Sequence, residues 1–442
     1  MTVMHSIRAR LAATVVLASL ALPARGAAQA LTLGEALDAA LGTHPALVAA
    51  EARVLAAADA GDAARATRLP AAAVTASLTH FQEPMVVAPL HSLNLTRPPA
   101  FDRTLVQGQF GARYTLFDGG ARGARIHGAD ALHDATLASR SSSEMRVLEE
   151  TAAAYMAALT ARAMLEAARA QAAALGEERS RAQRHFEAGS AAELEVLRAE
   201  AVLQEARAEE ASASARMGLA ERALARLMGA APQNLSGRTL TQVALRAQPP
   251  RGDARASPWI QQADRSVAAA EARLAEERAA RLPTVDAGAG LLDFGTTGGD
   301  HVLEWRAGFE VSWPVFTGGG RSAAVRRAAS EVAAARGELD AARLQVAQEV
   351  DASETAVLEA DARLEALQAA VTQWEEVARI EALALAAGSG EQRDLLGAEA
   401  GLFQARAGHA RARQDALLAR VRLARAEGVL SRAWINESME SR

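Results

Sequence analysis

The sequence contains no cysteine in its 442 residues. This excludes disulfides, thiolate metal ligands, a cysteine nucleophile and a lipid-modified N-terminal cysteine. Lysine is missing too, so all 48 residues counted as lysine or arginine are arginine. Long apolar runs are also lacking: the run at residues 11–22 is well short of the roughly 20 residues that a helix needs to span a bilayer. A membrane-spanning helix is therefore not expected.

The motifs of common enzymes are missing as well. The nine histidines are scattered and form no HExxH pair. The glycine run at residues 318–320 lacks the Lys-Ser/Thr of a phosphate loop, and neither Ser190 nor Ser389 lies in a GxSxG context. We therefore expect no catalytic residues, no cofactor and no metal site.

What the chain does contain begins with a segment typical of a secretory signal. Arg8 and Arg10 form a basic start, residues 11–22 an apolar core, and Ala28-Gln29-Ala30 a small-x-small cleavage site. Cleavage after Ala30 would also remove Arg25 and change the formal net charge from −5 to −8. An exported, mildly acidic protein is not expected to bind nucleic acid.

The rest of the chain is an internal repeat. Pro45 and Pro258, which open helix-like segments, are separated by 213 positions, as are the Leu-Pro pairs that close these segments. The stretches EAGSAAELEVL (187–197) and AAGSGEQRDLL (386–396) are separated by 199 positions. The first copy therefore has a fourteen-residue insertion, which we place within residues 82–100. The prolines of this stretch predict an irregular loop.

Each copy is predicted to fold as helix, strand, loop, strand, long helix, turn and helix. The long helix and the two shorter ones have matching summed lengths at about 1.5 Å per residue, so the shorter helices can stack end to end beside the long one. The predicted segments are a signal peptide (1–30), a first repeat (31–230), a linker (231–257), a second repeat (258–434) and a tail (435–442), with helices at about 45–68, 119–186, 190–229, 258–282, 319–386 and 391–434 and strands at about 71–81, 106–117, 284–294 and 302–315.

A heptad seam runs along both long helices. Apolar or small residues recur in steps of 4 and 3, so this face packs against another helix, either in a coiled coil or in an ordinary helical bundle. The seam positions are Val346, Val350, Ser353, Val357, Ala360, Leu364, Leu367, Val371 and Trp374 in the second copy, and the residues 199 positions earlier, from Val147 to Leu175, in the first.

The strands alternate between an apolar and a polar face, and each is about ten residues long, which is enough to cross a bilayer when tilted. Only 4% of the chain is aromatic, yet most aromatic residues fall in the two hairpins. Membrane interfaces select aromatics near strand ends, although capping of a soluble sheet core gives the same pattern. The expected membrane-facing aromatics are Phe110, Tyr114, Trp305, Phe309 and Trp313.

Four strands cannot close a barrel alone. An open edge in lipid leaves unpaired backbone groups that cost several kcal/mol each, and the smallest closed membrane barrels use about eight strands. If these strands lie in a membrane, several chains must therefore share one barrel.

The chain resembles the TolC-type outer membrane efflux proteins over nearly its whole mature length. The resemblance rests on LTLGEALDAALGTHPAL (31–47), YTLFDGG (114–120), SWPVFTGGG (312–320) and the two tip stretches above. It implies a mainly α fold with a membrane β part: a homotrimer with a shared twelve-strand barrel in the Gram-negative outer membrane and a long α-helical barrel in the periplasm. The implied partners are a periplasmic adaptor and an inner-membrane transporter, besides the lipid bilayer.

The resemblance also implies roles for the helical turns farthest from the membrane. Gly189-Ser190 and Gly388-Ser389 match the tips that dock the adaptor, and Glu195 and Asp394 match acids that line the pore entrance. Ordinary exposed helix acids remain an alternative for these two carboxylates.

Three positions depart from the family pattern near the second tip. Gly390 replaces an arginine that latches the closed gate in a well-studied member, Leu385 replaces an aromatic, and Gly397 replaces a second pore acid. The latch is therefore expected to differ.

The function predicted from the sequence is a passive exit duct of a tripartite efflux pump or of a type I secretion system. The cargo, whether a small molecule, a metal ion or a protein, stays open. An alternative of another class is a periplasmic coiled-coil adaptor or scaffold without a barrel, which should lack aromatic hairpins flanked by glycine stops.

Overall fold

The computed structural model describes residues 30–91, 96, 98–231, 238–246, 250–299 and 301–441. The predicted signal peptide therefore lies outside the described residues, apart from Ala30. The helices are α1 (Leu33–Thr43), α2 (Pro45–Ala66), α3 (Ala121–Glu187), α4 (Glu193–Leu227), η2 (Ala254–Ala256), α5 (Pro258–Ala279), α6 (Gly320–Ala386), α7 (Gln392–Ala426) and α8 (Arg432–Ser438), and the strands are β1 (Ala71–Val86), β2 (Phe101–Phe117), β3 (Val243–Leu245), β4 (Thr284–Thr296), β5 (His301–Ser312) and β6 (Met439–Ser441).

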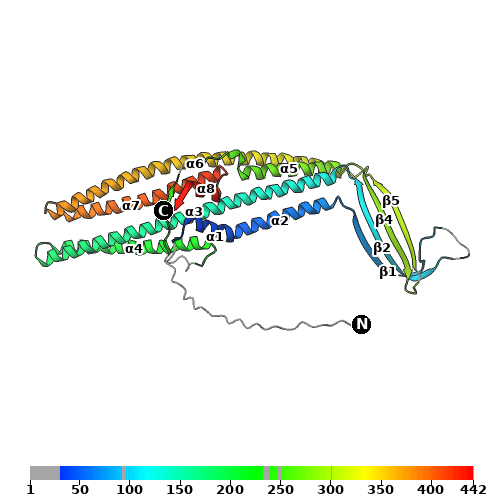
Figure 1. Ribbon diagram of the computed structural model, residues 1–442, viewed down its shortest axis with the longest axis horizontal. Helices are drawn as coiled ribbons and strands as arrows, with labels where there is room; N and C mark the ends of the chain where they lie inside the picture. Colours follow the sequence, from blue (N-terminus) through cyan, green and yellow to red (C-terminus); the bar gives the residue numbers. More distant parts are fainter. Residues whose placement is uncertain are drawn as a thin grey trace, which may run out of the picture.

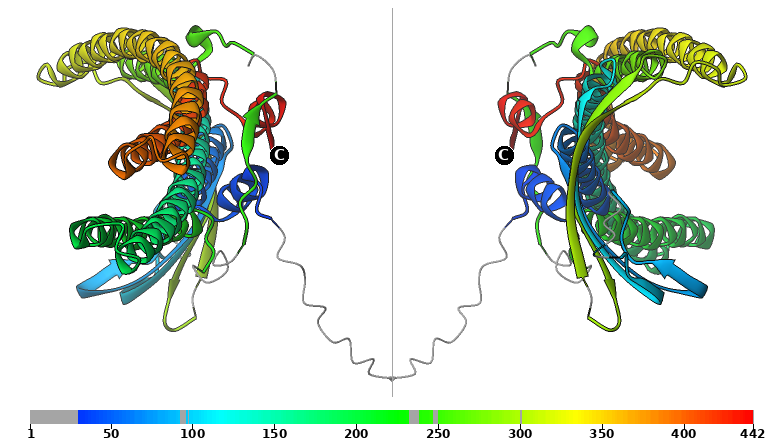
Figure 2. Two further views of the ribbon diagram at one scale, coloured as in Figure 1. Left: turned by 90° about the vertical axis from the view of Figure 1, so that its left-hand side faces the viewer. Right: turned by 90° about the vertical axis from the view of Figure 1, so that its right-hand side faces the viewer.

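The helices form a long, curved layer. Helices α3 and α6 have 67 residues each, which corresponds to about 100 Å. Helices α2 and α4 follow each other along α3, while α5 and α7 follow each other between α3 and α6 (Figure 1). This is the end-to-end stacking that the helix lengths predict. Figure 2 shows the layer curving, with α1 and α8 on its convex side.

The seam predicted from the heptads is buried between these helices. In α3, Val147, Thr151 and Ala158 are fully buried, and Leu165 and Leu175 nearly so. In α6, Val346 and Val371 are buried and most other seam positions are half-buried. Helix α3 is packed on both sides, whereas α6 lies at an edge of the layer and has only five buried residues.

A four-stranded antiparallel sheet extends from one end of the helical layer (Figure 1). Its strand order is β1-β2-β4-β5, so the two hairpins pair through β2 and β4. Strand β2 reaches α3 through Gly119 and Gly120, which have φ of 66° and 93°. Gly318 and Gly319 play the same part before α6, with φ of 59° and 82°. These positive φ values are easy for glycine and costly for other residues, which explains the repeated glycine stops.

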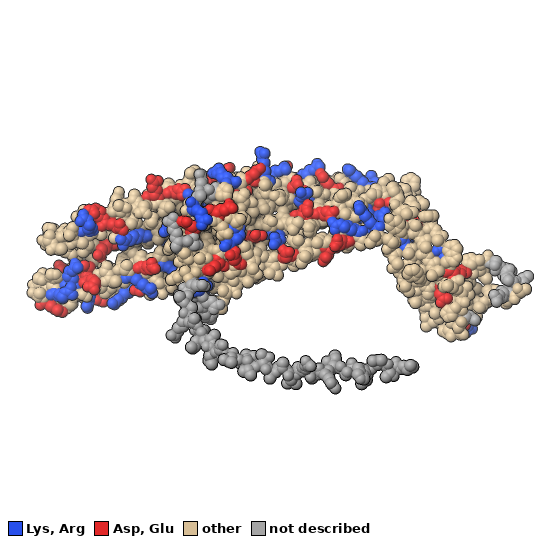
Figure 3. Space-filling model, viewed as in Figure 1, with Lys and Arg blue, Asp and Glu red and all other residues tan. Residues whose placement is uncertain are grey.

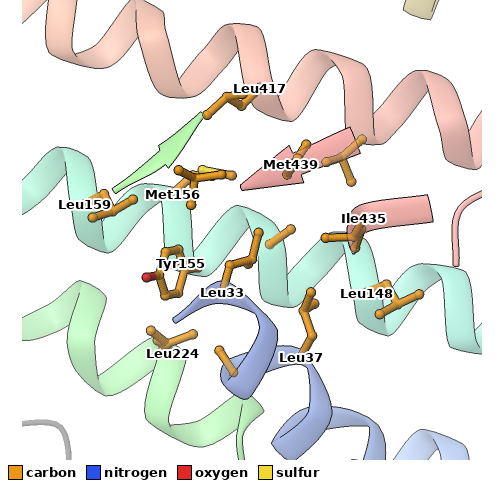
Figure 4. Packing of buried hydrophobic residues seen from close by; sticks show 14 of the residues in the cluster. Leu33, Leu37, Leu148, Tyr155, Met156, Leu159, Leu224, Leu417, Ile435 and Met439 are labelled. Atoms are coloured by element: carbon orange, nitrogen blue, oxygen red, sulfur yellow. The ribbon is translucent and has the colours of Figure 1, made fainter. Parts of the chain in front are cut away.

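A compact hydrophobic core lies beside the middle of α3, where α1, β3, α8 and β6 gather (Figure 4). Its centre is Tyr155, which is fully buried. The Tyr155 hydroxyl lies 2.7 Å from the carbonyl oxygen of Leu31 and 2.8 Å from that of Thr241. Burial, the largest influence, raises the pKa of this phenol to about 12. The contacts tie Leu31, just before α1, and Thr241, in the inter-repeat segment, to α3.

The structure differs from the predicted segments in several places. Strand β1 continues to Val86, and strand β2 starts at Phe101. Part of the predicted loop at 82–100 is therefore strand. The pairing of β1 with β2 has a register irregularity between His80 and Met85, which accommodates Pro84. Helix α1 was not predicted. The long second-copy helix predicted at 391–434 ends at Ala426, because Gly428 adopts a φ of 75° behind it.

The predicted linker and tail also contain regular structure. Strand β3 lies within the stretch assigned to the linker and pairs with β6, which lies within the stretch assigned to the tail. Helix α8 precedes β6, and the Trp434 indole nitrogen donates to the carbonyl oxygen of Pro250 at 3.3 Å. Both ends of the second repeat are thus fastened to the central core.

Candidate functional site: the sheet faces and the helical tips

One face of the sheet is largely apolar across all four strands, with Asp293 and its partner His301 near one end of the face as exceptions. Val74, Phe110, Leu291 and Trp305 form one cross-strand row, and paired residues of neighbouring strands point to the same face. Phe110 and Trp305 are 50% and 77% exposed, so this face is open to its surroundings in the single chain.

The other expected membrane-facing aromatics belong to the same face. Tyr114 and Phe309 lie in one row with Ala287 between them. Trp313 follows the end of β5, is largely exposed, and donates through its indole nitrogen to the carbonyl oxygen of Arg281 at 3.2 Å. In Figure 3 the sheet is mostly uncharged, whereas arginines and acids cover the helices. An exposed apolar face of this extent is typical of a surface that contacts lipid or protein.

The two helical tips lie at the end of the molecule far from the sheet (Figure 1). Each ends its long helix with a glycine in the left-handed region, Gly189 with φ of 72° and Gly388 with φ of 75°. The next residue closes the turn: the amide of Ser190 donates to the carbonyl oxygen of His185 at 2.9 Å, and that of Ser389 to Ala384 at 3.0 Å. This is the Schellman pattern, which satisfies carbonyl groups at a helix end.

The two acids expected at the entrance are exposed in the first turns of α4 and α7. Acids in a first turn are favoured by the helix dipole, so neither needs a pore to explain its position. Asp394 has a cationic neighbour, because the Arg393 guanidinium lies 3.4 Å from its carboxylate. Among the described residues, no ion pair engages the Glu195 carboxylate. The structure thus places both acids beside the tips but does not bring them together within one chain.

The glycine at position 390 is explained by the lack of room for a side chain in the turn. A Cβ atom at this position would lie 2.9 Å from the Cβ of Ala384 and 2.9 Å from the backbone nitrogen of Leu385. Contacts under 3.0 Å to backbone require the turn to shift. An arginine, as in the family pattern, does not fit this turn.

A pair of acids between α3 and α7, the buried Glu178 and the half-buried Glu399, was not anticipated from the sequence. Glu178 is only 4% exposed, and its carboxylate bonds Arg181 at 2.8 Å. Glu399 has a carboxylate oxygen that is buried without a hydrogen-bond partner among the described residues. Burial raises the pKa of the Glu399 carboxyl, the Glu178 charge raises it further, and Arg181 opposes the shift. No local pattern signals this pair, because the two residues come from different repeats.

Within the described ranges, no group of three or more histidine, aspartate or glutamate side chains is arranged to hold a metal ion. None of the helices in the described part of the chain is both long and apolar enough to cross a membrane.

Comparison with known proteins shows which family has this architecture. The family model described as outer membrane efflux protein matches residues 36–230 and 254–429, well over half of the chain. No curated protein sequence matches.

Three solved structures share the fold. The outer membrane protein VceC of Vibrio cholerae is 20% identical, with a TM-score of 0.76 over 90% of this chain and 96% of that chain. The CmeC outer membrane channel of Campylobacter jejuni is 16% identical, with a TM-score of 0.76 over 90% of this chain and 85% of that one. The open state of the MtrE outer membrane channel of Neisseria gonorrhoeae is 20% identical, with a TM-score of 0.72 and 90% of each chain covered.

Proposed function

The chain belongs to the outer membrane efflux protein family, the TolC-type channels, and we propose that three copies of it assemble into one passive duct from the periplasm to the exterior. Membership in this family makes the protein an outer membrane efflux channel with a periplasmic extension and not an enzyme. The rival interpretation as a periplasmic adaptor or scaffold is thereby set aside. The number of chains, the partners and the roles of the tips belong to the proposal.

The single observation that carries the proposal is the open sheet. Strands β1 and β5 each have a neighbour on one side only. In hydrocarbon these edges are costly, because their amide and carbonyl groups lack partners. Pairing β5 of one chain with β1 of the next removes every edge when the ring closes. Three chains with four strands each give about twelve strands, comfortably above the minimum of about eight.

The helical layer has matching open edges. Helix α6 exposes Leu344 and Leu358, which are 71% and 72% exposed, and on the opposite edge α2 exposes Val48 and Leu55. Apolar side chains at both edges of a curved layer suit a closed ring, in which α6 of one chain packs against α2 and α4 of the next. The concave side of the layer (Figure 2) then faces the axis.

The tips supply the surface for an adaptor. Phe186, Leu194, Leu197 and Leu383 are exposed apolar residues near the two turns, and such a patch favours a protein partner over water. An adaptor gripping the tips would connect the duct to an inner-membrane transporter that supplies the energy. In the assembly, Glu195 and Asp394 of three chains would surround the entrance and favour cations there.

Cysteine pairs test the assembly directly, because the chain has no native cysteine. Thr75→Cys in β1 is combined in turn with a cysteine at positions 304, 306, 308 and 310 of β5. We expect oxidation to link chains into dimers and trimers on denaturing gels for the combination that matches the intermolecular register.

The matched control combines Thr75→Cys with Gly290→Cys. Position 290 lies on the interior strand β4, between β2 and β5, and so it should form no link with β1. Monomers for every β5 position, in protein extracted from outer membranes, would exclude the shared sheet.

A further inference from the structure

On the polar face of the sheet, two neighbouring cross-strand rows each place an arginine beside glycine and alanine residues. Each row crosses all four strands, and each contains one arginine and otherwise only glycine or alanine. The rows are Ala71–Arg113–Gly288–Gly308 and Ala73–Gly111–Gly290–Arg306. The face is opposite to the aromatic one, because its residues alternate along each strand with Phe110, Trp305 and their neighbours.

Both guanidinium groups are available for a ligand. Arg113 and Arg306 are exposed, and over the described parts of the chain no ion pair or hydrogen bond engages either of them. Space is open at Gly308, where a Cβ atom would meet nothing within 4 Å, whereas a Cβ atom at Gly290, the strand partner of Arg306, would lie 3.0 Å from the carbonyl oxygen of Phe110. By contrast, many arginines of the helices are held by acids, as Arg125 is by Glu276 at 2.8 Å.

Acids lie in the rows on either side. Asp286 and Glu310 share the next row towards the helices, where the Thr115 hydroxyl donates to Asp286 at 2.5 Å. Glu304 is in the next row outwards and is bound by His91 at 2.9 Å. Rows two residues apart are separated by about 6.6 Å, close to the Debye length of about 8 Å. At this separation the acids, which outnumber the arginines on this face, partly offset their field. None of these acids forms an ion pair with Arg113 or Arg306, so both guanidinium groups keep their hydrogen-bond donors free for direct contact with a ligand.

Assembly of the ring does not neutralise these arginines. The strand next to β5 would be β1 of the following chain. Up to the register irregularity after His80, its residues on this face carry no charge: Ala71, Ala73, Thr75, Ser77 and Thr79. Arg306 thus gains no acidic neighbour from that strand, and three chains bring six guanidinium groups to one zone of the pore wall.

We propose that the two arginine rows form an anion-binding belt inside the barrel, which takes solutes bearing carboxylate, phosphate or sulfonate groups. This rests on the proposed function, because the face lines a pore only if the sheet closes with other chains. The planar guanidinium fork binds such oxyanions through two parallel hydrogen bonds. The belt would favour anions in the barrel, while the tip acids favour cations at the entrance.

Binding of pyrophosphate to the purified, detergent-solubilised protein tests the belt. Calorimetric titration at low salt is compared for the wild type, the double variant Arg113→Gln/Arg306→Gln and the control Arg326→Gln/Arg327→Gln, which removes two exposed charges from α6. We expect wild type and control to bind equally and the belt variant to bind at least about tenfold more weakly. Arg113→Lys/Arg306→Lys should show an intermediate affinity.

The outcomes separate the two proposals. Undiminished binding by the belt variant, or no binding by a wild-type trimer that conducts current in planar lipid, overturns the belt and leaves the duct standing. Absence of intermolecular cross-links between β1 and β5 overturns the duct itself. Circular dichroism of the variants guards against misfolding, and the exposed positions of both arginines make folding of the glutamine variants the expected result.

Discussion

Two carboxylates at equivalent positions of the repeat, Glu200 in α4 and Glu399 in α7, have opposite surroundings. Glu200 accepts hydrogen bonds from Gln204 at 2.7 Å and Arg179 at 3.0 Å. Its pKa is lowered chiefly by the Gln204 hydrogen bond, with Arg179 adding to the shift. Glu399 has a buried, unpaired carboxylate oxygen among the described residues, and burial raises its pKa. At the position equivalent to Arg179 the second copy has Ala378.

The difference follows from the position of each helix in the layer. Helix α4 packs chiefly against α3, whereas α7 packs against both α3 and α6. The duplication therefore conserves the pattern of helices and turns, but not the environment of matching residues. A side chain of the second repeat can be partly buried by the first, as Glu399 is beside Glu178.

The largest test of this comparison uses a matched pair of seam leucines. Leu165 in α3 is 3% exposed, and its equivalent in α6, Leu364, is half-buried. We expect Leu165→Ala to cost about 2–5 kcal/mol, because it leaves a cavity between packed helices. Leu364→Ala should cost roughly half as much. Thermal unfolding followed by circular dichroism in detergent measures both.

A conservative exchange to methionine at each site is the control, since it keeps the volume and should cost less than about 1.5 kcal/mol. Equal losses for the two alanine variants would mean that Leu165 and Leu364 are buried to the same degree in the assembled protein, against the difference in their exposure within the single chain.

The parts predicted from the sequence are those with a local signal. The glycine stops fixed the expected starts of α3 and α6 to within two residues, and the heptads identified the seam that is buried. Strands β3 and β6 gave no signal, because three residues have no periodicity and the partner of Val243 is Ser441, nearly the whole second repeat away. The tips were found from the repeated Gly-Ser pairs, but the pairing of Glu178 with Glu399 depends on packing between repeats. Spacing along one helix cannot reveal it.

An intermediate effect is expected at the second tip. Gly390→Ala puts a methyl group 2.9 Å from the Cβ of Ala384 and from the Leu385 backbone nitrogen. We expect this overpacking to lower the free energy of unfolding by about 1–3 kcal/mol. In the first copy Ala191 occupies the equivalent position, so Ala191→Gly should cost less than about 1 kcal/mol. Hydrogen exchange is the suitable readout, because the strain is local: the amides of Ser389 and Gly390, which donate to Ala384, should exchange faster in the first variant.

The reciprocal variant is its control. Faster exchange at Ser190 in Ala191→Gly, equal to that at Ser389 in Gly390→Ala, would show that both turns tolerate substitution alike and that Gly390 is not a steric requirement.

The smallest effect concerns how Glu399 and Glu200 make the stability depend on pH. Their pKa shifts have opposite directions, so the two pH dependences have opposite signs. The folded pKa of Glu399 is raised above 4.5, so its contribution to stability is fully present below about pH 4.5 and is lost as the pH rises through the folded value. Glu399→Gln should therefore raise the thermal stability at pH 7.5, by about 1 kcal/mol or less, and leave it nearly unchanged near pH 4.

Glu200 provides the mirror-image control. Its folded pKa lies below 4.5, so its contribution is present above that pH and is lost as the pH falls through the folded value. Glu200→Gln should lower the stability slightly at neutral pH and have no effect in strong acid. Melting curves of both variants between about pH 2 and pH 8 measure these changes. Parallel changes of the same sign would mean that the equivalent residues share one environment, and that the position of a helix in the layer does not control how its acids titrate.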